Sequence, residues 1–301
     1  MMIIETQGVT RRFGRQTAVD NVDFSLPEGA ALALVGANGA GKTTLLRLML
    51  NILRPSGGTA RVFGRDSTDL KAGDFERIGY VSENMKLPAR LSVGHYFDYL
   101  RPLYRTWDAE LEKDLRDEFN LPADRKINKL SHGMRVKTML TSVLAFRPPL
   151  LVLDEPLGGL DPAVRDDVLE GLIGRAGDTT ILMSTHELTD IEGFATHVAF
   201  MESGVLLFQD ETETLSRRMR EIHVTLPTPC DPPPDLPAGW RGFHASGRTL
   251  RFVDHAFRSA EDLREQLDVC GFSIERLDIR PLSLREIAVT YMRGNRQENG
   301  K

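Results

Sequence analysis

The stretch GANGAGKT, residues 36–43, constrains the fold of this chain more than any other part of its sequence. It has the form G-x-x-x-x-G-K-[ST] and lies between an apolar run at 30–35 and a helical pattern at 42–53, which predicts a strand, a loop and a helix in that order. Glycine permits backbone angles that a Cβ forbids, so successive N–H groups of such a loop converge on one anion. The first turn of the helix adds unpaired N–H groups and a positive dipole end. We therefore predict a phosphate-binding loop; the alternative is a glycine turn that binds nothing.

The residue types in this loop suit a nucleotide and a metal ion. Lys42 offers a mobile cation to the β- and γ-phosphates, and the hydroxyl of Thr43 suits Mg²⁺. The expected nucleotide-binding residues of the loop and the first helical turn are Gly36, Ala37, Asn38, Gly39, Ala40, Gly41, Lys42, Thr43 and Thr44.

Two acidic residues follow a second apolar run, Leu150–Leu153, which reads as a buried parallel strand. In an open parallel sheet, ligands bind at the carboxyl ends of the strands. Asp154 is therefore expected to hold Mg²⁺ beside Thr43, and Glu155 to accept a proton from an attacking water. The alternative for each is a solvated acid at the end of a strand.

Four further residues, three histidines and one phenylalanine, have different degrees of support. His186 ends another apolar strand at 179–183, so it is expected at the same sheet edge, within reach of the γ-phosphate or the attacking water. A lone histidine is more often structural, but its convergence on this edge favours function. Phe13 precedes the phosphate loop and either stacks on a nucleotide base or packs in the core. His95 and His132 have no such support from geometry.

The composition is that of a globular chain with two domains. At about 150 residues per domain, 301 residues suggest two. The net charge of −5 argues against a broad basic surface, so no nucleic-acid partner is expected. Cys230 and Cys270 lack metal-ligand spacing and are expected as reduced cytoplasmic thiols. No apolar run approaches the roughly 20 residues that cross a bilayer, so any membrane role requires another subunit.

Strand and helix patterns alternate over residues 1–220, which predicts an α/β domain. Residues of about 85–147 form a helical insert, and its apolar stripe around Tyr96 and Phe97 either packs in the core or faces a partner. Residues 221–301 contain a proline-rich loop at 227–237 between strand-like segments and predict a small α+β domain. Helices are expected at 187–193 and 283–292.

The order of these motifs resembles the nucleotide-binding subunit of ATP-binding-cassette (ABC) transporters over residues 1 to about 220. The sequence LSHGM at 130–134 falls at the family signature, usually LSGGQ, and GLD at 159–161 falls at the dimer-contact loop. The resemblance implies a P-loop NTPase core with a helical subdomain and ATP hydrolysis, with ATP and Mg²⁺ as cofactors. It makes Lys42, Glu155 and His186 the catalytic residues and Phe13 the adenine-stacking aromatic.

The resemblance also implies partners. Two such subunits are expected to meet head-to-tail, as a homodimer or as a heterodimer with another ABC ATPase subunit. Ser131, His132 and Gly133 of one subunit would then contact the γ-phosphate in the other, and Asp161 would lie at the dimer contact. A separate transmembrane permease subunit is expected to hold the protein at the cytoplasmic face of the cell membrane.

Three residues depart from the family pattern. Glu83 stands where most members have glutamine; its carboxylate can still meet Mg²⁺, so it is expected as a metal and ATP contact. His132 replaces a signature glycine, and Met134 replaces the signature glutamine. Glu83, the GM-ending signature and the C-terminal stretch 280–287 resemble type-2 ABC exporters, some of which are linked to drug or antibiotic resistance.

Two other functions compete with transport. One is a soluble ABC ATPase that acts on ribosomes or DNA; ribosomal members resemble two fused cassettes and DNA-repair members carry a long coiled coil, and this chain has neither. The other is a nucleotide-gated regulator that does not hydrolyse ATP. Glu155 and His186 argue against the regulator.

Overall fold

The computed structural model describes residues 1–177, 179–187, 193–229, 236–288 and 290. The chain forms two compact units, Met1–Gln209 and Asp210–Lys301. The division falls before the expected boundary at 220, because helix α7 (Thr212–Arg218) belongs to the second unit. Within that unit, Arg218 Nη2 donates to Asp210 Oδ2 at 2.8 Å and its carbonyl accepts from Phe257 N at 3.0 Å.

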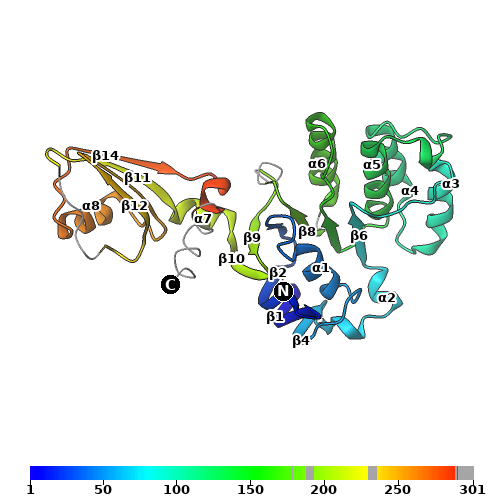
Figure 1. The fold of residues 1–301 in the computed structure, drawn as a ribbon. Coiled ribbons are helices and arrows are strands. Elements are labelled where there is room, and N and C mark those ends of the chain that lie inside the picture. The colour runs from blue at the N-terminus through cyan, green and yellow to red at the C-terminus, as the bar shows by residue number, and fades with distance from the viewer. Residues whose placement is uncertain (178, 188–192, 230–235, 289, 291–301) are drawn as a thin grey trace. The chain divides into compact units, whose positions relative to one another are not determined.

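The first unit contains a six-stranded sheet of order β10-β9-β3-β8-β7-β6. Every residue of β7 and β8 is buried, as parallel strands covered on both faces require. Figure 1 shows α3 to α6 on one side of this sheet and α1 on the other. The pairs from β9 through β3, β8 and β7 to β6 are parallel, so the carboxyl ends of these strands share one edge. The strands are β3 (Ala31–Val35), β6 (Ile78–Ser82), β7 (Leu150–Asp154), β8 (Thr180–Thr185), β9 (His197–Glu202) and β10 (Val205–Glu211).

A second, antiparallel sheet of the first unit has the order β2-β1-β4-β5 and packs against helix α1. Leu45 and Leu46 of α1 are fully buried in the same core cluster as Ile4 and Val62 of this sheet. The helix ends at Met49, not at 53 as predicted, and Asn51 has a φ of 55°, which a continuing helix excludes. The elements are β1 (Met2–Phe13), β2 (Gln16–Pro27), α1 (Lys42–Met49), β4 (Gly57–Val62), β5 (Arg65–Asp66), η1 (Ser67–Asp69) and α2 (Ala72–Phe75).

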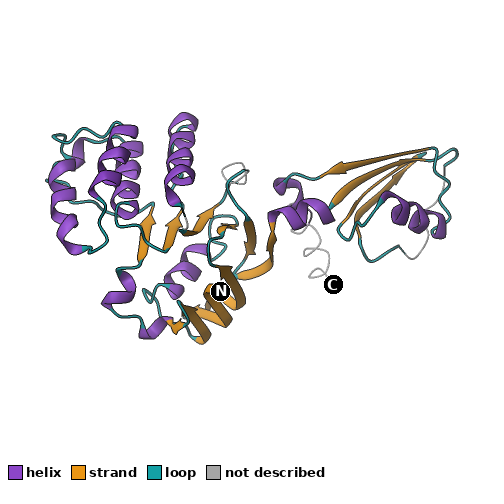
Figure 2. Ribbon diagram, turned by 180° about the vertical axis from the view of Figure 1, so that it is seen from behind, coloured by secondary structure: helices purple, strands orange, loops and turns teal. Residues whose placement is uncertain are grey.

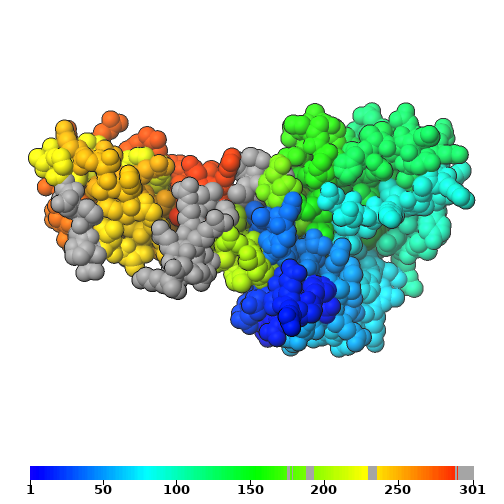
Figure 3. Space-filling model, viewed as in Figure 1, coloured from blue at the N-terminus to red at the C-terminus, as the bar shows by residue number. Residues whose placement is uncertain are grey.

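The helical insert shares one core cluster with β6, β7 and β8. Tyr96 and Phe97 are buried among residues of α4 and α5, so this part of the apolar stripe is core, whereas Leu103 is 54% exposed. On the face drawn in the space-filling view of Figure 3, the first strands (blue) lie in the lower part of the first unit and the insert (cyan to green) in the upper part. The elements here are α3 (Val93–Leu100), η2 (Arg101–Leu103), α4 (Ala109–Glu118), η3 (Ile127–Lys129), α5 (His132–Leu144) and, after β7, α6 (Pro162–Ala176).

The second unit is an antiparallel sheet of order β12-β13-β11-β14 with helix α8 packed on it (Figure 2). Leu263 and Leu267 of α8 are buried in one core cluster with Ile222, Val224 and Phe252 of the sheet. The predicted helix at 283–292 is seen at 284–288, and most of the rest of that range lies outside the described residues. Most of the predicted helix at 187–193 also lies outside the described residues. The elements are α7, β11 (Arg220–Thr225), β12 (Trp240–Ser246), β13 (Thr249–Asp254), α8 (Ala260–Val269) and β14 (Arg276–Pro281). None of the helices in the described part of the chain has the length and apolarity to cross a bilayer.

Candidate nucleotide-binding site

The glycine-rich loop joins β3 to α1, and close backbone contacts explain its glycines. A Cβ on Gly36 would lie 2.2 Å from the carbonyl oxygen of Met201, and one on Gly41 would lie 2.3 Å from that of Ala18. Gly41 also has a φ of 105° and Gly39 a φ of 83°, which L side chains rarely adopt. Any other residue at 36 or 41 would force the loop away from its neighbouring strands.

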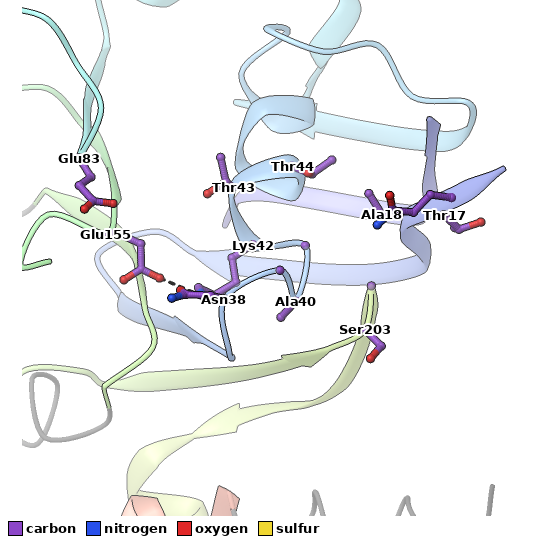
Figure 4. Close-up of a pocket in the computed structure, with 14 residues that line it drawn as sticks. Thr17, Ala18, Asn38, Ala40, Lys42, Thr43, Thr44, Glu83, Glu155 and Ser203 are labelled. Carbon is purple, nitrogen blue, oxygen red and sulfur yellow. Dashed lines mark ion pairs between the residues drawn. The ribbon is translucent and has the colours of Figure 1, made fainter. Parts of the chain in front are cut away.

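A cavity of about 550 Å³ opens beside this loop (Figure 4). Its wall brings the loop together with Glu83 and Glu155, two of the three acids expected near the metal ion and the attacking water. The lining residues are Gln16, Thr17, Ala18, Asn38, Gly39, Ala40, Gly41, Lys42, Thr43, Thr44, Glu83, Glu155, Ser203 and Gly204.

Lys42 is only 4% exposed, and its ammonium group is held by the site itself. Nζ donates to the carbonyl oxygens of Gly36 at 2.6 Å and Ala37 at 3.3 Å. It also forms an ion pair with Glu155 Oε1 at 2.9 Å, drawn as a dashed line in Figure 4. A phosphate that binds Lys42 must therefore compete with the Glu155 carboxylate.

Asp154 lies at the end of β7 and accepts two hydroxyl hydrogen bonds. Thr43 Oγ1 donates to Asp154 Oδ1 at 2.9 Å, and Ser184 Oγ donates to the same oxygen at 2.8 Å. The first bond joins the residue after the phosphate-loop lysine to the strand-end acid; the metal ion that they are expected to share stays a prediction. Ser184 was not predicted; the parallel pairing of Asp154 with Ser184 across β7 and β8 places it there.

Glu155 adopts a φ of 50°, which is uncommon for a residue with a side chain. Its backbone N–H donates to the carbonyl and the hydroxyl of Ser184, at 3.3 Å and 3.0 Å, and these bonds hold the strained turn. Oε2 lies 2.8 Å from His186 Nδ1, while Oε1 pairs with Lys42. The carboxylate is thus fixed between two nitrogen groups at the mouth of the phosphate loop.

Hydroxyl and carboxylate oxygens are the ligands that Mg²⁺ prefers, and this ion usually keeps several waters and binds substrate phosphates. The Thr43–Asp154 pair fits that preference, with Glu83 on the same cavity wall. The backbone N–H of Glu83 donates to the Asp154 carbonyl oxygen at 3.0 Å, which ties the end of β6 to the end of β7.

Several predicted site residues lie away from the cavity. Phe13 is 46% exposed and carries the Arg11 guanidinium 4.6 Å from its ring centroid; its role in base stacking stays a prediction. Ser131 Oγ accepts from Met134 N at 3.2 Å and caps α5, and Asp161 Oδ1 accepts from Val164 N at 3.1 Å and caps α6. His132 Nε2 lies 2.9 Å from the carbonyl oxygen of Gly158.

Part of the cavity wall escaped prediction. Gln16–Ala18 are the first residues of β2, and Ser203 and Gly204 form the turn between β9 and β10. The first half of β2 and this turn meet in space: Asp20 N donates to the Gly204 carbonyl oxygen at 2.9 Å. No local motif marks either segment, because only the tertiary fold brings them beside the loop.

A glycine loop with a buried lysine, facing an Asp–Glu pair at the edge of a parallel sheet, defines a phosphate-loop nucleotide hydrolase. The family description "ABC transporter" matches residues 19–158. The chain is 33% identical over 220 residues to a daunorubicin/doxorubicin resistance ATP-binding protein, DrrA, of Streptomyces peucetius, covering 70% of this chain and 66% of that protein. It is 31% identical over 224 residues to the ABC transporter ATP-binding protein YhaQ of Bacillus subtilis, covering 72% and 74%.

A third relative and two solved structures agree with these matches. The bacitracin transport ATP-binding protein BcrA of Enterococcus faecalis is 30% identical over 223 residues, covering 73% of this chain and 72% of BcrA. A solved ATP-binding subunit of an ABC transporter superposes with a TM-score of 0.65 at 25% identity, covering 71% of this chain and 92% of that one. The fold also matches the dimeric cassette MJ0796 bound to ADP and Pi, with a TM-score of 0.61 at 20% identity over 69% and 98% of the two chains.

The chain belongs to the ABC transporter family, as an ATP-binding and ATP-hydrolysing subunit. The family resemblance, the P-loop NTPase fold and the ATPase activity predicted from the sequence are thereby confirmed. Subunits of this family work with membrane permease subunits and form dimers.

Proposed function

We propose that this chain uses the binding and hydrolysis of MgATP to drive substrate export through a separate transmembrane permease subunit. The observation that carries the hydrolytic part is the position of Glu155, held between Lys42 and His186 at the phosphate loop. Outward transport is supported by the relatives named for drug resistance and bacitracin transport. An Fe(3+) ion import protein matches at 29% identity, so a transport assay must decide the direction.

The contacts of Lys42 suggest how ATP organises the site. A triphosphate in the loop takes over the ammonium group from Glu155, which frees a carboxylate beside the γ-phosphate. Glu155 then accepts a proton from the attacking water, while His186 Nδ1 keeps its other oxygen in place. Thr43, Asp154 and Glu83 would hold Mg²⁺, whose charge neutralises the β- and γ-phosphates.

The signature segment suits an anion in a partner subunit. Ser131 caps the 13-residue helix α5, and the first N–H groups of a helix attract negative charge. In a head-to-tail homodimer or heterodimer, Ser131, His132 and Gly133 reach the γ-phosphate held by the partner. Asp161 then lies at the subunit contact. Docking on the permease places the protein at the cytoplasmic face of the membrane.

The proposal is tested by transport in inside-out vesicles that contain the permease and this chain. We expect ATP-dependent uptake of the exported compound into such vesicles and none with Glu155→Gln. Uptake into right-side-out vesicles instead would indicate import. An ATPase that neither binds membranes with the permease nor responds to it would be a soluble enzyme, and ATP binding without turnover would indicate a regulator.

A further inference from the structure

His132 makes a contact that a glycine at the same signature position cannot make. It is the first residue of α5, and its Nε2 lies 2.9 Å from the carbonyl oxygen of Gly158. A carbonyl oxygen only accepts hydrogen bonds, so the ring carries its proton on Nε2. A side chain of the signature segment is thereby bonded to the backbone of another loop in the same subunit.

That loop runs from Glu155 to Asp161, from the proposed general base to the cap of α6. It is tightly turned: Gly158 N donates to the Glu155 carbonyl oxygen and Leu160 N to that of Leu157, both at 3.3 Å. Glu155 is held at a φ of 50° at its start. A shift of Gly158 is therefore transmitted through one turn to the strained backbone of Glu155.

The surrounding packing makes the start of α5 and this loop move together. A Cβ on Gly133 would lie 2.7 Å from Val164 Cγ1, so the first turns of α5 and α6 are in close contact. On the other side, a Cβ on Gly158 would lie 3.4 Å from Glu83 Oε1. The loop thus lies between the signature helix and the wall of its own subunit's nucleotide cavity.

We propose that His132 is a positioning residue that couples the two ATP sites of the dimer. The inference rests on the proposed head-to-tail dimer, in which the start of α5 serves the partner's ATP and Glu155 serves the subunit's own. Binding of the partner's γ-phosphate fixes α5, and the His132–Gly158 bond passes that restraint to the Glu155 loop. ATP at one site therefore favours the hydrolytic arrangement at the other, which is positive cooperativity.

The test compares His132→Ala, His132→Gln and His95→Ala in the full-length chain. Glutamine replaces the ring N–H with an amide N–H that reaches the same carbonyl. His95 is an exposed histidine in the first turn of α3 and serves as the matched control. ATPase rate is measured against ATP concentration, and ATP affinity is measured separately with a fluorescent nucleotide.

We expect the wild type and His95→Ala to hydrolyse ATP with a Hill coefficient above one. His132→Ala should lower the coefficient to about one and kcat by about five- to tenfold, as for loss of one hydrogen bond. The separate affinity measurement reports any lost contact to the partner's γ-phosphate. His132→Gln should restore most of the coefficient and most of kcat. Wild-type cooperativity in His132→Ala, no rescue by glutamine, or a non-cooperative wild type would each overturn the coupling while leaving the ATPase assignment intact. A wild type without ATPase activity would overturn the proposed function and, with it, this inference.

Discussion

Replacing Glu155 with glutamine tests two roles of one carboxylate. The substitution keeps the shape of the side chain and removes its charge and most of its basicity. Losing a general base slows hydrolysis by about 10²- to 10⁴-fold, so we expect turnover at least about 100-fold below wild type. We expect ATP to bind more tightly at the same time, because Glu155 Oε1 no longer holds Lys42.

The size of the affinity gain follows from the Lys42–Glu155 contact. Two unit charges 2.9 Å apart attract by about 6 kcal/mol at an effective dielectric constant of 20. Desolvation of both groups offsets most of that attraction, since their side chains are only 5% and 15% exposed. If about 1.4 kcal/mol of net attraction remains, the need to break the ion pair weakens ATP binding about tenfold. Glu155→Gln, which has no ion pair to break, should then bind ATP about tenfold more tightly than the wild type.

Single-turnover hydrolysis and titration with a fluorescent ATP analogue separate the two effects. Glu187→Gln is a suitable control, because Glu187 carries the same charge near His186 while its side chain pairs with Arg165. We expect that control to leave both measurements within about threefold of wild type, as for a partly exposed ion pair. Wild-type turnover in Glu155→Gln would remove Glu155 from catalysis, and unchanged affinity would refute the competition for Lys42. With hydrolysis blocked, size-exclusion chromatography with MgATP should also show a dimer where the wild type is a monomer.

Substitutions at three further positions test the phosphate loop, the metal site and the second unit. Lys42→Ala should abolish ATP binding at micromolar nucleotide, because the loop loses its side-chain cation; unchanged affinity by calorimetry would refute the assignment. Glu83→Ala should weaken stimulation of ATPase activity by the permease, while Glu83→Gln should retain hydrolysis and change nucleotide affinity modestly; intact stimulation in reconstituted membranes for the alanine variant would make Glu83 a solvated acid. Burial raises the pKa of Asp254, so its stabilisation of the fold is lost as pH rises through that raised pKa. Asp254→Asn should therefore raise Tm more at pH 7 than at pH 4, and an equal shift at both would contradict this.

The phosphate loop and the strand-end acids were predictable because each depends on a local pattern. Glycine spacing, the lysine that follows it and the apolar run before Asp154 are read within a few residues of one another. Parallel strands then bring their carboxyl ends to one edge, so the meeting of Thr43 with Asp154 needed no knowledge of side-chain positions. The helix after the loop was predicted four residues too long, because the positive φ of Asn51 leaves no mark in the apolar pattern.

What could not be predicted depends on turns from distant segments and on side-chain positions within an ångström. The start of β2 at Gln16–Ala18 and the turn at Ser203–Gly204 complete the cavity without any motif. The domain boundary was placed at 220 because α7 follows β10 closely in sequence, while its hydrogen bonds join it to the second unit. The sequence predicts His132 as a departure from the signature and as a contact to the partner's γ-phosphate, but its bond to Gly158 is visible only in the structure.

The contacts of Glu155 explain why such a site would not consume ATP indiscriminately. Its two oxygens are engaged by Lys42 and His186, so the proposed base is held in position by the same ammonium group that ATP needs. When ATP replaces Glu155 as the partner of Lys42, the same exchange would free the Glu155 carboxylate to act as the base. The loop that begins at Glu155 is bonded through Gly158 to the signature helix, which is expected to complete the site only in a dimer. Hydrolysis would accordingly require both the nucleotide and the partner subunit, which is what coupling to transport demands.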